Sequence, residues 1–294
     1  MLLPTRQAVI AERARAKINL TLRVIGRRAD GYHLLESLIA FADVGDEVRV
    51  RPGTAPSVSM SGSYAGAITG GNLIDTTLDR LAAADPQLVL GAVEVEKRLP
   101  IAAGIGGGSA DAAAVLRAVR RANPERSIDW ESIAASLGAD VSVCLVDRSS
   151  LVWGVGEHVA PVASLPRLSV VLVCPLAAAP LQKTKSVFRQ LSLPVADDSE
   201  PPAPLPGVAD AAALLAHMRS IGNDLRQAAQ AVMPVCAEVE AALAALPDCR
   251  YVSLSGAGPT SYGVFDDDDA ARAAAEHLRT HHPDWWITAT TLGD

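Results

Sequence analysis

The stretch "LPIAAGIGGGSADAAAVLRAV", residues 99–119, places four glycines within five positions, directly before a serine and an alanine-rich run. Glycine lets backbone amide groups approach and converge on an anion. Beyond the glycines, apolar residues recur at helical spacing, at Ala112, Val115, Leu116 and Val119. The stretch therefore predicts a glycine turn that opens a helix, with Ser109 at the helix start. Such a turn either holds a phosphate at the positive end of the helix or only lets a strand pack on a helix.

Three known glycine patterns do not fit this stretch. In the dinucleotide fingerprint G-x-G-x-x-G, Ser109 stands in place of the third glycine. The P-loop requires a Gly-Lys pair, and the chain contains none. The nucleophile elbow G-x-S-x-G has Asp111 in place of its last glycine. What remains is a cradle of backbone amides without its own lysine, so we expect positive charge from elsewhere in the chain, with Lys17 as the candidate.

Composition excludes several classes of protein. The 294 residues are 49% hydrophobic and 20% charged with a net charge of −7, which is typical of a globular protein and not of a nucleic-acid binder. The four cysteines show no metal-ligand spacing. The sequence has no secretory signal pattern and no apolar run of about 20 residues. We expect a soluble, cytoplasmic protein with a small-molecule substrate, without nucleic-acid or membrane partners, as a monomer or weak homodimer.

Alternation and turn residues outline the other elements. Alternating apolar residues over 18–24 predict a half-buried strand whose period of two puts Lys17 and Asn19 on one face. The run "WESIAASLGAD" predicts a helix that Gly138 ends, and the following "VSVCLV" predicts a strand, so Asp140 is expected at a helix-to-strand junction. The second half predicts an α+β unit. Its expected elements are a strand at 167–176, a proline-rich loop at 193–207, helices within 223–246, a strand, turn and strand at 249–265, a helix at 270–280 and a closing strand at 285–292.

Three ordered motifs resemble one enzyme family, the GHMP kinases. They are "ARAKINLTL" at 14–22, P-x-x-A-G-x-G-G-G-S-A-D-A-A-A at 100–114 and "LSGAGPTSYGVF" at 254–265. The resemblance covers nearly the full length. It implies an α+β two-domain GHMP kinase fold, with an N-terminal α/β domain like ribosomal-protein S5 domain 2 and a C-terminal ferredoxin-like domain. The implied boundaries are 1–164 for the ATP-binding domain and 165–294 for the domain that contributes to the substrate cleft.

The segment "AKINLTLRVIGRRADGYHLLESL", residues 16–38, narrows the resemblance within the family. It is similar to the branch that transfers the γ-phosphate of ATP to the 2-hydroxyl of a cytidine-diphosphate-linked methylerythritol, in the non-mevalonate route to isoprenoids. The short runs "NLI", "LGADV", "GVGE" and "GNDL" extend the similarity. Two other functions stay open from the sequence: another small-molecule kinase of the family, of the homoserine or mevalonate type, and a nucleotide-binding homologue that has lost catalysis.

The resemblance also assigns catalytic residues. Asp140, in "GADV", is implied as the general base that accepts the proton of the hydroxyl; the alternative is an aspartate that caps a turn after Gly138. Lys17 is expected beside it, where an ammonium orients the base and stabilises developing charge; the alternative is a solvated lysine at a strand end. Asn19 would hydrogen-bond a substrate hydroxyl or cap a sheet edge.

For the nucleotide, the resemblance implies phosphate contacts along the glycine motif and Mg²⁺ bound with help from the Ser109 hydroxyl. Asn72 and Lys97 resemble positions that line the adenosine pocket. The implied nucleotide-binding residues are Pro100, Gly104, Gly106, Gly107, Gly108, Ser109, Asn72 and Lys97.

For the cytidyl substrate, Tyr32 is implied to stack on the base and His33 to read its polar edge, although a core tyrosine and a surface histidine would also fit the sequence. In "TKSVF", Phe188 is the second stacking candidate and Thr184 a polar contact. Gly256, Ala257 and Gly258 would bring backbone amides to the diphosphate or erythritol, or form only a hairpin turn.

Three departures from the family pattern leave local loop shape open. Arg15 stands where proline is frequent, two residues before the lysine. Val141-Ser142-Val143 replaces a Val-Pro-Phe run, and Ala257 replaces the serine of G-S-G. None of these departures removes an implied catalytic group.

Overall fold

The computed structural model describes residues 8–67, 72–176, 180, 182–196, 201–205 and 207–293. These residues form two compact units. Unit 1 contains residues 8–16, the described residues of 45–101 and residues 106–147, and unit 2 contains 17–44, 102–105 and the described residues from 148 onward. The chain passes between the units within two long strands, β1 (Ile10–Asn19) and β3 (His33–Pro52). The glycine-rich stretch is thereby divided, with Ala102–Ile105 in unit 2 and the residues from Gly106 in unit 1.

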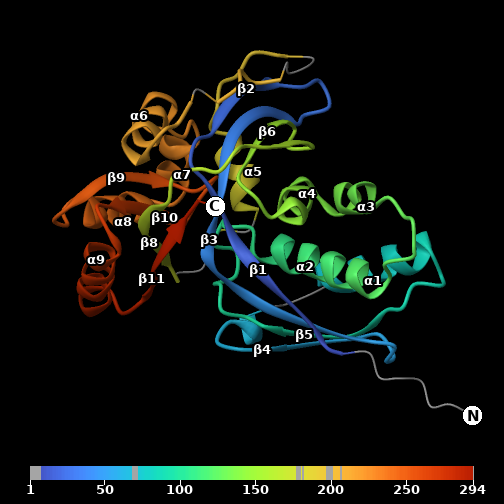
Figure 1. Cartoon of the computed structure of the whole chain (residues 1–294). Helices are drawn as coiled ribbons and strands as arrows, with labels where there is room; N and C mark the ends of the chain where they lie inside the picture. Colours follow the sequence, from blue (N-terminus) through green and yellow to red (C-terminus); the bar gives the residue numbers. More distant parts are fainter. Residues whose placement is uncertain are drawn as a thin grey trace, which may run out of the picture. The chain divides into compact units, whose positions relative to one another are not determined.

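In unit 1, helices cover one face of a small sheet (Figure 1). Strand β5 (Gly91–Glu96) pairs antiparallel with the second half of β3 and parallel with β4 (Ser57–Ser61). Alternate residues of β5 are buried, as the period of a half-buried strand requires. The helices are α1 (Leu73–Ala84), α2 (Gly107–Ala122), α3 (Trp130–Leu137) and α4 (Ala139–Val146), with the short 3₁₀ turn η1 (Ala65–Ala67). Helix α2 buries its alanine-rich face, because small side chains let it pack closely between α1 and α4.

In unit 2, the C-terminal part forms an antiparallel sheet in the order β11-β8-β10-β9. These strands are β8 (Leu168–Pro175), β9 (Cys249–Leu254), β10 (Ser261–Phe265) and β11 (Trp285–Leu292). Helices α8 (Val235–Ala244) and α9 (Asp268–His281) pack on this sheet. Leu243 of α8 and Leu278 of α9 belong to the same buried cluster as Phe265 of β10. This β-α-β-β-α-β arrangement is the ferredoxin-like fold expected from the sequence.

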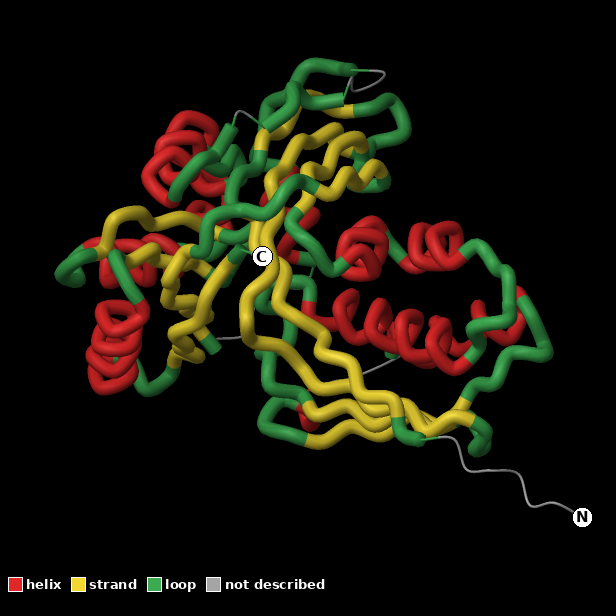
Figure 2. Tube along the Cα trace, in the orientation of Figure 1, coloured by secondary structure: helices red, strands yellow, loops and turns green. Residues whose placement is uncertain are grey.

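The rest of unit 2 is built around the first half of β3. That part of β3 pairs with β2 (Arg23–Arg27) and β6 (Ser150–Gly154), and β6 pairs with β7 (His158–Pro161). Helices α5 (Lys183–Phe188), α6 (Ala211–Ile221) and α7 (Arg226–Val232) complete the unit. Figure 2 distinguishes these strands from the connecting loops.

Most predicted elements of the second half are confirmed, including the closing strand and the helix before it. Of the predicted proline-rich loop, residues 197–200 and 206 lie outside the described part of the chain, and the described remainder contains neither helix nor strand. Within the described ranges, every helix is too short or too polar to cross a membrane.

Two local predictions are wrong. The run "VSVCLV" belongs to helix α4 and not to a strand, so Asp140 lies in the first turn of a helix. A short apolar run has no periodicity of its own, and here packing of α4 against α2 decides for a helix. Ser109 is not the N-cap of α2, because the helix already begins at Gly107 with Gly106 as its cap, which places Ser109 at the third helical position.

Candidate active site

In unit 1, helix α2 begins without a capping side chain. Its N-cap, Gly106, has a left-handed backbone (φ 71°) and makes no side-chain capping bond. Gly108 is exposed and Ser109 half-buried in the first turn. First-turn amides have no partner inside a helix, and with the helix dipole they attract an anion. The start of α2 therefore has the chemistry of a phosphate site.

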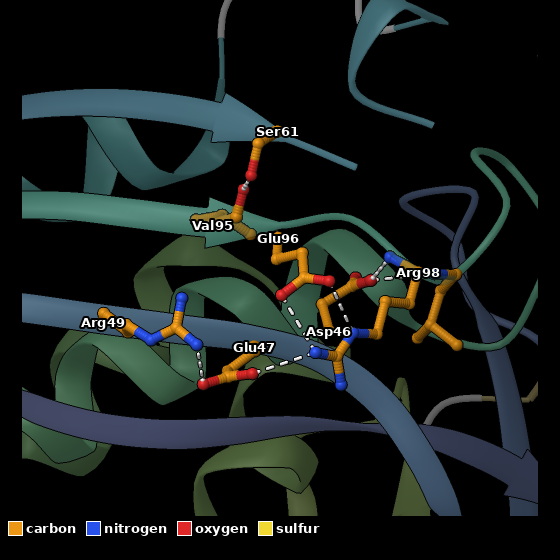
Figure 3. A network of polar contacts seen from close by, with 8 residues as sticks. Asp46, Glu47, Arg49, Ser61, Val95, Glu96 and Arg98 are labelled. Carbon is orange, nitrogen blue, oxygen red and sulfur yellow. Dashed lines mark hydrogen bonds and ion pairs between the residues drawn. The ribbon is translucent and has the colours of Figure 1, made fainter. Parts of the chain in front are cut away.

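Lys97 lies in the interior of unit 1 between two carboxylates. Its side chain is 2% exposed, and its ammonium pairs with Asp46 and, at 2.6 Å, with Asp111 of α2. Asp46 also accepts hydrogen bonds from the amides of Arg98 and Leu99, at 2.6 and 2.8 Å. Figure 3 shows Asp46 beside the exposed ion pairs of Arg98. Because its ammonium is enclosed by two carboxylates, Lys97 has no free charge to offer the adenosine it was predicted to contact.

The buried triad of Lys97, Asp46 and Asp111 shifts the ionisation of its members. Burial raises the pKa of Asp111 to about 7; Lys97 opposes this rise and Asp46 adds to it. Burial acts to lower the pKa of Lys97, but the two carboxylates outweigh it and hold that pKa above its usual value. Among the described residues, Oδ1 of Asp111 has no hydrogen-bond partner. The triad ties α2 to the segment after β5, a role that the sequence pattern did not reveal for Asp46 or Asp111.

Three further predicted residues of unit 1 have clear positions. Asp140 is exposed in the first turn of α4, where a carboxylate is stabilised by the helix dipole. Asn72 is the N-cap of α1, and its side-chain oxygen accepts a hydrogen bond from the Ile74 amide at 3.0 Å. Pro100 is buried. The predicted placement of Lys17 beside Asp140 joins residues of different units and stays a prediction.

In unit 2, Lys17 and Asn19 lie on the same face of β1, as their spacing predicted. Nζ of Lys17 donates to Oδ1 of Asn19 at 3.3 Å, and both residues are buried. The amide nitrogen of the Asn19 side chain donates to Ser37 at 2.8 Å, and its backbone amide donates to Oγ of Ser255 at 3.2 Å. The Asn19 side chain is thereby oriented with its oxygen toward the lysine.

The turn between β9 and β10 lies against Asn19. A Cβ atom on Gly256, whose φ is 56°, would lie 3.3 Å from Oδ1 of Asn19. Within the turn, the amide of Gly258 donates to the carbonyl of Ser255 at 2.9 Å. Ala257 is 9% exposed and packs in an apolar cluster with Leu254. The alanine that departs from the family pattern therefore contributes packing at this position.

A cavity of about 1030 Å³ in unit 2 is lined by all four residues predicted to bind the nucleoside. They are Tyr32, His33, Thr184 and Phe188. The rings of His33 and Phe188 are stacked, with centroids 4.6 Å apart, and Tyr32 is 64% exposed at the cavity. His33 thus covers one face of the Phe188 ring, the ring that the sequence analysis predicted to stack on the base. Burial, with a smaller contribution from the positive charge of Arg27, lowers the pKa of His33.

Lys183 was missed by the sequence reasoning, which considered only the neighbouring "TKSVF" run. Its side chain is buried at the start of α5, and Nζ donates to the carbonyls of Ala102, at 2.6 Å, and Gly258. A lone lysine beside a short helix is usually exposed, so the local sequence carries no signal for this role.

The described residues hold no group of three or more histidine, cysteine, aspartate or glutamate side chains suited to a metal ion.

Family comparison connects these features to a class of enzyme. Residues 72–149 match the GHMP kinases N terminal domain, and residues 209–284 match the GHMP kinases C terminal domain. The first match contains the glycine segment and Asp140, and the second contains the β9–β10 turn. The chain belongs to the GHMP kinases and is accordingly a kinase, with the two-domain fold predicted from its motifs.

Full-length relatives narrow this assignment. A protein of Dinoroseobacter shibae named 4-diphosphocytidyl-2-C-methyl-D-erythritol kinase is 46% identical, over 96% of this chain and 95% of its own length. A protein of the same name from Rhodopseudomonas palustris is 43% identical over 96% and 98%. A crystal structure of 4-(cytidine 5'-diphospho)-2C-methyl-D-erythritol kinase matches with a TM-score of 0.77 and 34% identity, over 97% of this chain and all of that one. Within the GHMP kinases, the chain therefore belongs to the 4-diphosphocytidyl-2-C-methyl-D-erythritol kinase family.

A more distant structure shows how far the fold extends. Homoserine kinase from Cytophaga hutchinsonii matches with a TM-score of 0.67 at 16% identity, over all of this chain and 98% of that one. Identity this low shows a shared fold and carries no statement about substrate.

Proposed function

We propose that the chain transfers the γ-phosphoryl group of ATP to the 2-hydroxyl of 4-diphosphocytidyl-2-C-methyl-D-erythritol, in the methylerythritol phosphate route to isoprenoids. The observation that carries the proposal is the 46% identity to a kinase of that name over 96% of the chain. The cavity lined by Tyr32, His33 and Phe188 supports it, because aromatic rings suit the base of a cytidine diphosphate.

For ATP, we propose that the phosphates bind the backbone amides of the glycine motif. The uncapped start of α2 supports this placement. Mg²⁺ fits the Ser109 hydroxyl together with phosphate oxygens and water, and when bound it would neutralise phosphate charge. The nucleotide-binding set stays as the sequence implied it: Pro100, Gly104, Gly106, Gly107, Gly108, Ser109, Asn72 and Lys97. Lys97 is kept in this set on the family resemblance alone, because its side chain is buried between Asp46 and Asp111.

For the chemical step, we propose that Asp140 accepts the proton of the 2-hydroxyl. The Asp140 carboxylate is exposed in the first turn of α4 and therefore accessible to a substrate, which supports this role. Lys17 would stabilise the negative charge that develops on the oxygen, since its ammonium is held in place by Asn19 in a buried environment. Asn19 would orient the acceptor through the same side chain.

For the cytidyl substrate, we propose that Tyr32 and Phe188 supply ring surfaces and that His33 reads the polar edge of the base. The lowered pKa of His33 favours a neutral imidazole, which offers one donor and one acceptor. Thr184 is proposed as a further polar contact. Gly256, Ala257 and Gly258 are proposed to meet the diphosphate or the erythritol through backbone amides, of which that of Gly258 already donates to Ser255 within the turn.

We further propose residues 1–164 as the ATP-binding domain and 165–294 as the domain that contributes to substrate binding. The enzyme would act in the cytoplasm as a monomer or weak homodimer, without nucleic-acid or membrane partners. Its net charge of −7 supports the exclusion of nucleic acid. Sedimentation velocity on the full chain measures the assembly state, and a stable higher oligomer would contradict this part of the proposal.

The proposed reaction is tested by coupling ADP release to a spectrophotometric signal. The purified chain is supplied with ATP, Mg²⁺ and one acceptor at a time: the cytidyl methylerythritol compound, homoserine, mevalonate or galactose. We expect turnover with the cytidyl compound only, and phosphorus NMR should show the new phosphate at the 2-position. Turnover confined to one of the other acceptors would contradict the assignment.

A further inference from the structure

The segment Ala102–Ile105 is held by hydrogen bonds along its whole length within unit 2. Four successive carbonyls accept bonds from four different residues. They are Nζ of Lys183 to Ala102 at 2.6 Å, Oγ1 of Thr260 to Ala103 at 2.7 Å, Oγ of Ser255 to Gly104 at 3.5 Å and the amide of Lys17 to Ile105 at 2.9 Å. Among these donors, only the Lys183 ammonium carries a charge at its donor atom. Bonds to a charged donor are roughly twice as strong as neutral ones.

Lys183 also connects this segment to the turn that follows β9. Its ammonium donates to the carbonyl of Gly258 as well as to that of Ala102. At the same place, Gly104 lies so close to the turn that a Cβ atom on it would be 2.2 Å from the Gly258 oxygen and 3.4 Å from Nζ of Lys183. One buried ammonium therefore bridges two backbone segments that touch each other.

The charge of Lys183 has no carboxylate beside it in the described part of unit 2. The titratable groups that act on it are the thiols of Cys174, on β8, and Cys236, on α8. Burial raises the pKa of Cys174 to about 11 and that of Cys236 to about 12, so both thiols are uncharged near neutral pH. Burial likewise lowers the pKa of Lys183 to about 8. The lysine is thus mostly protonated at neutral pH and loses its proton in mild alkali.

We propose that Lys183 is a positioning residue: its ammonium holds Ala102–Ile105 against the Gly256–Gly258 turn, and its positive charge favours a phosphate group of the substrate at that turn. This inference rests on the proposed function, which brings the substrate's diphosphate to the turn. Lys183 acts through the two carbonyls it holds, since its own side chain is buried. An anion bound nearby stabilises the protonated lysine, so binding and protonation favour each other.

The test compares wild type with Lys183→Met in steady-state assays across pH 6.5–9.5 with the cytidyl substrate. We expect kcat/KM to fall about 10- to 100-fold at neutral pH, as for loss of a hydrogen bond to a charged group. Wild type should lose kcat/KM above about pH 8 with the slope of one proton, and the variant should lack this alkaline limb. A merely structural role would leave the position of the limb unchanged.

Matched variants separate charge from structure. Thr260→Val removes the neutral hydroxyl donor to the next carbonyl and keeps the backbone amide of residue 260, which donates to the same oxygen at 3.2 Å. It should therefore lower kcat/KM less than Lys183→Met does and keep the alkaline limb. Arg272→Met removes an exposed positive charge on α9 and should behave as wild type. Lys183→Gln provides an uncharged replacement with a donor in case the methionine variant does not fold.

Two results would count against the proposals in different ways. Wild-type turnover with an alkaline limb that Lys183→Met or Lys183→Gln retains would overturn the role of Lys183 alone. Absence of wild-type turnover with the cytidyl substrate would overturn the proposed function and, with it, the inference that depends on it.

Discussion

The ammonium of Lys97 lies 2.6 Å from Oδ2 of Asp111, and both side chains are almost completely buried. Asp46, which is also buried, completes the triad from the other side. Removing one partner from such a buried group leaves the remaining charge without compensation, which destabilises the protein. The arrangement therefore makes Lys97 a structural residue of unit 1, next to the helix that carries the proposed phosphate site.

Lys97→Met should strongly destabilise the protein, because two carboxylates would be left buried without a cation. We expect the free energy of unfolding to fall by about 3–5 kcal/mol, measured by urea denaturation. Arg98→Ala is the matched control: Arg98 is 47% exposed and makes only surface ion pairs. Its loss should change stability by about 1 kcal/mol or less. Equal effects of the two substitutions would contradict the structural role of Lys97.

Gly104→Ala should destabilise the protein more than Gly53→Ala. Both glycines have a positive φ, 79° and 74°, so each substitution strains the backbone by about 1–2 kcal/mol. A Cβ on Gly53 meets nothing within 4 Å, whereas one on Gly104 would collide with the carbonyl of Gly258. Urea denaturation measures the free energy of unfolding of both variants. Because both share the backbone strain, the difference between them reports the collision with Gly258. Indistinguishable unfolding energies would show that Gly258 moves aside freely.

Phe188→Ala should weaken binding of cytidine nucleotides, because the ring lines the cavity beside His33. Loss of one aromatic stacking surface costs about 1–3 kcal/mol, or roughly 5- to 150-fold in the dissociation constant. Isothermal titration calorimetry with CDP measures the change. His282→Ala breaks a stacked pair with Trp285 elsewhere in unit 2 and should leave CDP affinity unchanged. CDP binding to Phe188→Ala with wild-type affinity would place the nucleoside outside this cavity.

Acid should destabilise the protein partly through His33. Burial and the charge of Arg27 lower its pKa in the folded state, so between the folded and unfolded pKa values the unfolded chain binds more protons. The stabilising contribution is present above the unfolded pKa and is lost as pH falls through the folded pKa. We expect the fall in Tm from pH 7.5 to pH 5.5 to be smaller for His33→Gln than for wild type. Equal decreases in Tm would show that folding does not change the pKa of His33.

Asp140→Asn should lower kcat by about 100-fold or more if the carboxylate takes the hydroxyl proton. The coupled ADP assay measures the rate with saturating cytidyl substrate. Asp129→Asn is a matched control, since Asp129 caps α3 and asparagine caps equally well. A decrease of less than about threefold in Asp140→Asn would mean that another group is the base. Lys17→Arg should also lose activity, because a planar guanidinium does not replace a compact ammonium.

Patterns within one segment predicted much of this protein correctly. Alternation placed Lys17 and Asn19 on one face of β1, and the hydrogen bond between their side chains confirms it. Glycine spacing followed by small apolar residues predicted helix α2, since both signals depend on neighbours along the chain. Three motifs in order were enough to predict the GHMP kinase fold and family.

Local patterns gave a wrong prediction where a short run of residues fits two kinds of secondary structure. The run "VSVCLV" suits a strand or a buried helix equally, and its packing on α2 made it helix α4. Some residues predicted from the motifs also contact side chains that could not be predicted from those motifs. Asp46 and Asp111 enclose Lys97, and His33 stacks on Phe188 from a segment more than a hundred residues away.

Lys97 and Lys183 show most clearly that the local sequence pattern does not predict burial and ionisation. In the sequence, the motif resemblance assigns Lys97 to the adenosine pocket, and Lys183 looks like an ordinary charged residue beside a short helix. In the fold, Lys97 is paired inside unit 1, and Lys183 is held by two backbone carbonyls inside unit 2. A residue's type and its neighbours determine which element it joins and which chemistry it offers. Its burial and ionisation depend on distant segments, because these remove water and supply or withhold the opposite charge.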